Sequence, residues 1–315
     1  MSLRAWSAFA AISFLWGIPY LFIKVAVDDG VPPIFVAWSR VVMAAAVLVL
    51  LAWRAGTLGT LRGRGRWIAA FAVAEISIPF PLISLGEVHV DSSLAAIVIA
   101  AVPLIVALLA VAFAPAERAS GARLLGLLIG FAGVIVLVGV DLTGSTEELL
   151  GALAILGAAV GYAVGPMLLR AKLADIDARA TMGASLAVAA VVLTPFMVVD
   201  PPTETPSSSA VLSIVVLGLF CTAVAFIVYS ALVAEVGAGR AVVITYVAPV
   251  VALALGVAVL GESPGPGAVV GLLLILAGSW MSTDGRLPPG LAAVLERRRW
   301  RVRRGVRASV NELST

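Results

Sequence analysis

Residues 101–134 read "AVPLIVALLAVAFAPAERASGARLLGLLIGFAGV", and residues 247–279 read "VAPVVALALGVAVLGESPGPGAVVGLLLILAGS". Each stretch places a proline in an apolar run, a glutamate after that run, and glycines at helical spacing beyond it. The correspondence extends along the chain at an offset of 146 residues, or 145 after one deletion: Trp16 with Tyr162, Lys24 with Arg170, Pro103 with Pro249, and Glu117 with Glu262. The chain therefore contains an internal repeat, which constrains its whole fold.

The composition is that of a membrane protein. The 315 residues are 62 % hydrophobic and 12 % charged, with a mean hydropathy of +1.12, whereas a soluble domain has about 25 % charged residues. A single cysteine, Cys221, and a single histidine, His89, exclude an intramolecular disulfide, a cysteine-built metal site and the two-histidine zinc motifs. The sequence also lacks a Walker-type phosphate-binding motif. We therefore expect no cofactor and no ATP-driven transport by this chain alone.

Ten apolar segments of near-spanning length divide the chain. A helix that crosses a bilayer takes about 20 residues, and most of the segments are bounded by charged residues, glycine or proline. The segments are 5–27, 33–53, 67–86, 92–113, 124–140, 149–169, 180–199, 209–233, 240–260 and 266–283. We predict an all-α polytopic membrane protein with ten transmembrane helices.

Basic residues mark one side of this arrangement. If the N-terminus is cytoplasmic, 19 of the 21 lysines and arginines lie at the N-terminus, in cytoplasmic connections or in the C-terminal tail, and the other two, Lys24 and Arg40, lie within spans. The opposite connections carry only acidic charges, among them Asp28 and Glu262. Because cytoplasmic connections accumulate lysine and arginine, we predict a multi-pass protein of the plasma membrane with both termini cytoplasmic. The basic tail, 284–315, is expected to rest on anionic lipid and not on nucleic acid.

Each repeat contains five spans, which is an odd number. The first repeat begins inside and ends outside, so the second begins outside. We therefore predict two inverted five-helix repeats, 1–140 and 146–283, followed by the tail 284–315. A pseudo-two-fold axis in the membrane plane relates such repeats, and many secondary transporters use this arrangement for alternating access.

The same residues carry a family resemblance. The stretches "FLWGIPYLFIK" (14–24), "FVAWSR" (35–40) and "LGLFCTAVAFIVYSALVAEVGAGRAVVITYVAPVVAL" (217–253), with the proline, glutamate and glycine pattern that ends both halves, resemble the EamA-type drug/metabolite transporters. The resemblance covers nearly all of residues 8–283. It implies ten helices around a central cavity and transport, often outward, of small metabolites, amino acids or drugs. The chain departs from the family pattern at "AEISIPFPL" (74–82) in the third span.

Glycines recur at helical spacing in residues 126–133, 157–165 and 267–278. Small residues let helix backbones approach closely in a membrane. We expect these faces to pack within the monomer, with a dimer contact as the alternative. The predicted assembly is accordingly a monomer or a weak homodimer.

Prolines and aromatic residues supply the first candidates for a substrate site. Pro103 and Pro249 lie within the fourth and ninth spans, and paired breaks in two repeats indicate a midplane binding site; simple packing kinks are the alternative. Four aromatic residues near mid-depth are candidates to line the cavity, with lipid contact as the alternative: Trp16, Tyr162, Tyr229 and Tyr246.

Two charges lie deep in spans. Arg40 is roughly 10 Å from the outer end of the second span, and Glu75 is roughly 13 Å from the inner end of the third. A charge at a helix centre costs about 2.5–3.5 kcal/mol on insertion scales, so such groups face a cavity or a partner. Glu75 is therefore a candidate for proton or substrate binding, and a structural ion pair with Arg40 is the alternative. Lys24 precedes Asp28 by four residues near the outer surface, which predicts either snorkelling of the lysine or an ion pair on one helix face.

These features favour a secondary transporter that moves a small amphipathic metabolite, an amino acid or a drug across the plasma membrane by alternating access. Export is the expected direction, and protons are the candidate coupling ion. A non-transporting scaffold or a passive channel is the alternative. An enzyme is not expected, because the spans hold neither paired carboxylates nor a nucleophile beside a base.

Overall fold

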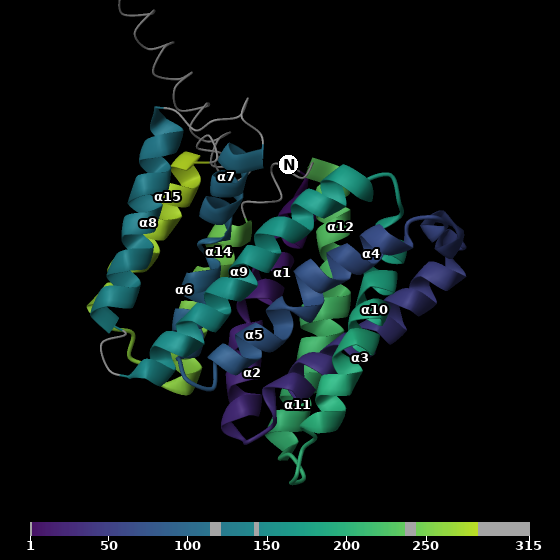
Figure 1. Cartoon of the computed structure of the whole chain (residues 1–315), viewed down its shortest axis with the longest axis horizontal. Coiled ribbons are helices and arrows are strands. Elements are labelled where there is room, and N and C mark those ends of the chain that lie inside the picture. Colours follow the sequence, from purple (N-terminus) through teal and green to yellow (C-terminus); the bar gives the residue numbers. More distant parts are fainter. Residues whose placement is uncertain (1, 114–120, 142–144, 237–243, 283–315) are drawn as a thin grey trace, which may run out of the picture.

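The computed structural model describes residues 2–113, 121–141, 145–236 and 244–282 (Figure 1). Every regular element in these residues is a helix, which confirms the predicted all-α class. Glu117, Arg240 and the tail 284–315 lie outside the described residues.

Seven helical segments are long and apolar enough, by length and composition, to cross a membrane: Leu3–Asp28, Pro33–Arg54, Gly65–Gly86, Ser92–Leu109, Thr146–Lys172, Ala178–Val199 and Ser208–Val236. Three shorter apolar helices coincide with the remaining predicted segments: Leu124–Leu137, Ile244–Leu260 and Pro266–Met281. The polytopic membrane class therefore holds. The count of ten spans and the inverted relation of the repeats stay predictions.

Six helices run without interruption: α3 (Pro33–Arg54), α8 (Ala122–Asp141), α9 (Thr146–Lys172), α10 (Ala178–Val199), α14 (Ile244–Leu260) and α15 (Pro266–Ser282). A short 3-10 helix, η1 (Thr57–Leu61), follows α3.

Four spans are interrupted. Two are broken near a proline, namely α1 (Leu3–Gly17) with α2 (Pro19–Asp28), and α6 (Ser92–Ile99) with α7 (Val102–Phe113). Two contain a π-helical turn, namely η2 (Val73–Ser77) between α4 (Gly65–Ala72) and α5 (Pro79–Gly86), and η4 (Leu219–Val224) between α11 (Ser208–Gly218) and α12 (Ala225–Val236). Proline ends a helix because it lacks a backbone donor and clashes with the preceding turn.

Helices distant in the sequence pack side by side, notably α8 with α15, α3 with α10, α5 with α9 and α2 with α11 (Figure 1). Glycines set the closest approach between α8 and α15. A Cβ on Gly133 would lie 2.9 Å from the backbone oxygen of Gly271, and a Cβ on Gly278 would lie 2.4 Å from the backbone nitrogen of Gly130. The predicted packing of these glycines within the monomer is confirmed.

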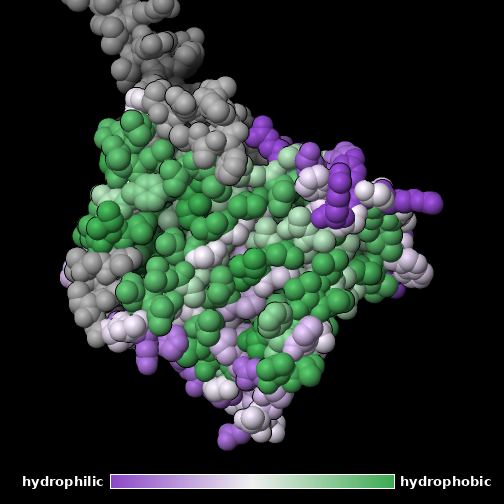
Figure 2. All heavy atoms as spheres, in the orientation of Figure 1, coloured by the Kyte–Doolittle hydropathy of each residue, from purple (hydrophilic) through white to green (hydrophobic). Residues whose placement is uncertain are grey.

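The surface separates into an apolar belt and polar ends. Figure 2 shows hydrophobic residues over the middle of the visible face and hydrophilic ones above the α3–α4 connection and along the opposite edge. At one end, Arg64 of the α3–α4 connection bonds Asp175 of the α9–α10 connection at 2.6 Å. At the other end, the Ser207 amide donates to Asp29 at 2.9 Å, and the predicted Lys24–Asp28 ion pair is confirmed at 2.9 Å. Connections predicted to share a side of the membrane are thus in contact.

Candidate functional site

Two π-helical turns lie at matching places in the repeat. η2 covers Val73–Ser77 and η4 covers Leu219–Val224, so the offset of 146 residues places one on the other. A π turn changes the regular pattern of backbone hydrogen bonds in a helix. In both turns a side-chain hydroxyl donates to a backbone carbonyl five residues earlier. Ser77 Oγ donates to the Ala72 carbonyl at 3.2 Å, and Thr222 Oγ1 donates to the Leu217 carbonyl at 2.8 Å. Because π turns often mark functional sites, the pair defines where a site is to be sought.

Arg40 bridges α3 to both of these spans. Its Nε and Nη2 donate to Thr222 Oγ1 in η4 at 3.3 and 3.1 Å, and its Cζ lies 4.0 Å from the centre of the Phe80 ring in α5. The side chain is 5 % exposed. A guanidinium has five N–H donors, so three remain without a partner among the described residues. Within the described residues, Arg40 and Glu75 form no ion pair. The alternative of a structural pair between them is therefore not found in this structure.

Glu75 lies in η2 against a glycine face of α9. A Cβ on Gly165 would lie 1.9 Å from Glu75 Oε2, and one on Gly161 would lie 2.4 Å from the Ala74 carbonyl oxygen. These glycines therefore make room for the π turn and for the carboxylate. Oε2 is buried and has no hydrogen-bond partner within the described residues. Burying a carboxylate oxygen without a donor is costly, so Glu75, a half-buried residue, remains a candidate to bind a proton or a cation.

Aromatic side chains border these two charges. The ring of Trp16 lies 4.8 Å from that of Tyr229 and 6.1 Å from that of Phe226, measured between centroids. Tyr162 lies within electrostatic range of both Arg40 and Glu75. The repeat-related pair Trp16 and Tyr162 packs against the same hydrophobic cluster. The structure therefore stacks Trp16 against Tyr229 and Phe226, and it places Tyr162 within electrostatic range of Arg40 and of Glu75.

Three other predicted residues lie apart from the charged pair. The hydroxyl of Tyr246 donates to the Ser279 carbonyl of α15 at 3.2 Å. Pro103 follows the break between α6 and α7, as a helix-breaking proline predicts. Pro249 lies inside the uninterrupted helix α14, so the two repeats do not break in the same way at these prolines.

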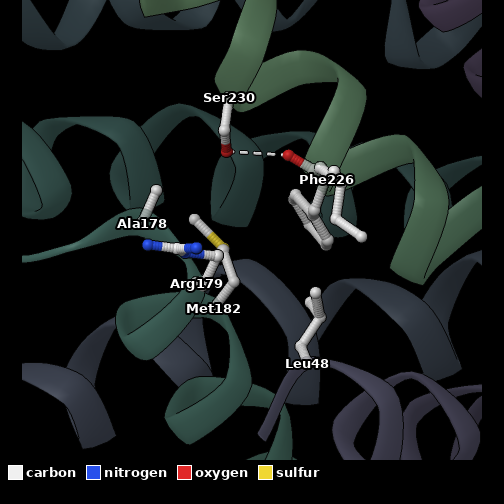
Figure 3. Close-up of a pocket in the computed structure, with 7 residues that line it drawn as sticks. Leu48, Ala178, Arg179, Met182, Phe226 and Ser230 are labelled. Atoms are coloured by element: carbon white, nitrogen blue, oxygen red, sulfur yellow. Dashed lines mark hydrogen bonds between the residues drawn. The ribbon is translucent and has the colours of Figure 1, made fainter. Parts of the chain in front are cut away.

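A small pocket opens elsewhere, between α3, α10 and α12 (Figure 3). Its lining is mostly apolar and consists of Leu48, Ala178, Arg179, Met182, Phe226, Ile227 and Ser230. The dashed line in Figure 3 is the bond from Ser230 Oγ to the Phe226 carbonyl, at 2.7 Å. The pocket contains none of the predicted site residues. One of its lining residues, Phe226, packs its ring on Trp16.

Sequence reasoning missed Thr222 and Phe80. A threonine or a phenylalanine in an apolar span carries little chemical signal by itself. The repeat supplied one indication, since its offset matches Glu75 with Cys221, the neighbour of Thr222.

Comparison with known proteins identifies the family of the chain. The EamA-like transporter family matches the chain twice, over residues 4–139 and 149–283. A probable terminal-alkyne amino-acid exporter of Streptantibioticus cattleyicolor is 31 % identical over 271 residues, covering 84 % of this chain and 88 % of the relative. A probable amino-acid metabolite efflux pump of Escherichia coli is 25 % identical over 282 residues, covering 86 % and 92 %.

A solved crystal structure shares the fold. It has a TM-score of 0.63 and 23 % identity, and the match covers 90 % of this chain and 97 % of the other. Both halves of the sequence match the same family, as the internal repeat requires. The chain therefore belongs to the EamA-like transporter family.

Proposed function

We propose that the protein exports a small amphipathic zwitterion, with amino acids as the substrate class, across the plasma membrane by alternating access. The observation that carries this is the pair of opposite charges within spans, each without an ionic partner among the described residues. A molecule with a carboxylate and an ammonium group complements both. The printed names of two relatives, an amino-acid exporter and an amino-acid metabolite efflux pump, support the class and the direction.

In this proposal Arg40 binds the substrate carboxylate with the donors that Thr222 leaves free. Arginine suits a carboxylate because its planar fork can donate two parallel bonds. Glu75 binds the ammonium group, and the rings of Trp16 and Tyr229 contact the apolar side chain. A proton on Glu75 competes with the ammonium group, which couples substrate release to proton entry. Accumulation driven by a proton gradient is the expected consequence.

Three probes of one shape test the charge requirement: phenylalanine, its decarboxylated amine phenethylamine, and its deaminated acid 3-phenylpropionate. The full chain in lipid nanodiscs is expected to bind phenylalanine more tightly than phenethylamine or 3-phenylpropionate. Each missing contact should weaken binding about tenfold or more, since a charged hydrogen bond contributes about 1.5–3 kcal/mol. Arg40→Lys should lower the preference for phenylalanine over the amine, and Glu75→Gln should lower its preference over the acid.

Two outcomes would contradict the proposal. Equal binding of all three probes would show that the charges do not select the ligand. In proteoliposomes, downhill flux without counterflow would indicate a passive channel, whereas counterflow with proton-driven accumulation supports a secondary transporter. Glu75→Gln should retain counterflow and lose the proton-driven accumulation.

A further inference from the structure

A second buried carboxylate lies away from the candidate site. Glu87 directly follows α5, at the end of the bundle that carries Asp28. Its side chain is 0 % exposed, and neither Oε1 nor Oε2 has a hydrogen-bond partner within the described residues. Desolvating an ionised carboxylate without donors is among the costliest burials a protein makes. The group is therefore either neutral or supplied with a missing partner.

Lys24, a basic side chain beside Glu87, is already bonded to other groups. Lys24 Nζ on α2 pairs with Asp28 at 2.9 Å and donates to the Glu87 backbone carbonyl at 3.0 Å, not to its carboxylate. Arg40 on α3 lies in electrostatic range but donates to Thr222. Neither basic side chain thus neutralises Glu87 by direct contact.

The neighbouring acid, Glu262, accepts hydrogen bonds from other groups. Glu262, in the connection between α14 and α15, accepts from the backbone amides of Ser92 and Ser93 at 2.8 and 3.0 Å. Its carboxylate fits the notch at Gly256, where a Cβ would lie 2.2 Å from Oε2. An anion at these amides caps the N-terminus of α6 and is stabilised there by the helix dipole. Both oxygens of Glu262 are thus engaged by backbone amides, and this carboxylate disfavours a second negative charge on Glu87.

The charged and titratable groups facing Glu87 come from three elements. α2 presents Tyr20, Lys24 and Asp28, α3 presents Arg40, and the α14–α15 connection presents Glu262. α9 packs on the adjacent Gly86 with Gly151 and Ile155, which do not titrate. Burial raises the pKa of Glu87 well above its usual range, and Glu262 and Asp28 raise it further, while Lys24 and Arg40 oppose them.

We propose that Glu87 is a second proton-binding site, which holds a proton in the conformation described here and exchanges it with solvent at the Asp28 end. Lys24 joins the Glu87 backbone carbonyl to Asp28, whose side chain is 55 % exposed, so the surface at that end lies beside this site. Proton binding by Glu87 does not rest on the proposed function.

Infrared difference spectroscopy of the full chain in nanodiscs tests the site without any substrate. The carbonyl stretch of a protonated carboxylic acid should be present at neutral pH in the wild type and lost in Glu87→Gln. Glu147→Gln is the matched control, because Glu147 is an exposed acid at the same end of the bundle. An unchanged carbonyl band in Glu87→Gln would overturn the proposal.

Thermal stability gives an independent measurement. A carboxyl whose folded pKa is raised stabilises the fold at low pH, and the stabilisation is lost as pH rises past the free-residue value of about 4.3. The Tm of the wild type should therefore fall more steeply with rising pH than that of Glu87→Gln, and Glu147→Gln should follow the wild type. Equal slopes in all three proteins would refute protonation of Glu87. Phenylalanine counterflow in the same preparation separates this result from failure of the proposed function.

Discussion

At the scale of single residues, the two charges within spans, Arg40 and Glu75, have different surroundings. Arg40 is held by a hydroxyl and an aromatic face, which position the guanidinium without neutralising it. Glu75 rests on a glycine face that offers no donor to Oε2. Neither charge therefore has an ionic partner within the described residues, and the proposed function rests on this.

Thr222 is the residue whose loss should reveal this arrangement. Thr222→Val keeps the shape of the side chain but removes the acceptor for Arg40 and the donor to Leu217. We expect the free energy of unfolding to fall by about 1–3 kcal/mol, because a buried charge loses its hydrogen-bond partner. Ser230→Ala is the control, since the Ser230 hydroxyl donates to the Phe226 carbonyl of its own helix and, within the described residues, to no other helix. Unfolding in nanodiscs measures both, and equal losses would contradict a special role for Thr222.

The sequence identified the two charges but not their surroundings. Arg40 and Glu75 are conspicuous because a charge in an apolar run demands a reason. Thr222 is 182 residues from Arg40, and only the packing of α3 against η4 brings them together. The ion pair considered from sequence fails for the same reason, because depth along two helices does not determine which faces meet.

At the scale of helices, the apolar segments were predictable and their irregularities only in part. Breaks near Pro19 and Pro103 follow from the missing backbone donor of proline. The π turns η2 and η4 have no comparable composition signal, and they were not predicted. Their matching positions suggest that both repeats use the same backbone device, with Glu75 in one and Thr222 in the other.

Two glycines of α9, one turn apart, should respond differently to alanine. In Gly161→Ala the new Cβ would lie 2.4 Å from the Ala74 backbone oxygen, which cannot move away easily. In Gly165→Ala it meets mainly the end of the Glu75 side chain, at 1.9 Å. We expect Gly161→Ala to lower the free energy of unfolding by about 1–3 kcal/mol, the usual cost of overpacking. Gly165→Ala should stay closer to wild type in stability but bind phenethylamine differently.

Gly157→Ala serves as the control for both variants. Its Cβ would meet only the Leu82 Cδ1 atom, at 3.2 Å. Thermal unfolding and phenethylamine binding, measured on all three proteins, separate packing from ligand effects. A Gly165→Ala protein as unstable as Gly161→Ala would show that Glu75 is fixed by packing and not free to adjust.

At the scale of the whole molecule, the distribution of charge and the contacts between connections define the same two ends. The α3–α4 and α9–α10 connections meet through Arg64 and Asp175, and both were predicted to be cytoplasmic. The opposite end joins Asp29 to Ser207 and Glu262 to Ser92. Composition predicted this separation because the basic residues are so unevenly placed. The pairing of particular helices, such as α8 with α15, required tertiary information that no single segment contains.

The last prediction is that the end with Arg64 faces the cytoplasm and the end with Asp29 faces outward. The positive-inside rule favours this orientation, because 19 of 21 basic residues then lie inside. Single cysteines in a Cys221→Ser background test it in intact cells with a membrane-impermeant maleimide. Glu204→Cys, in the exposed connection after α10, should react directly, whereas Arg62→Cys should react only after lysis. A reporter active only outside the cell, fused after Thr315, should remain silent. Labelling of Arg62→Cys in intact cells would reverse the orientation, and would place Glu87 at the cytoplasmic end of the molecule.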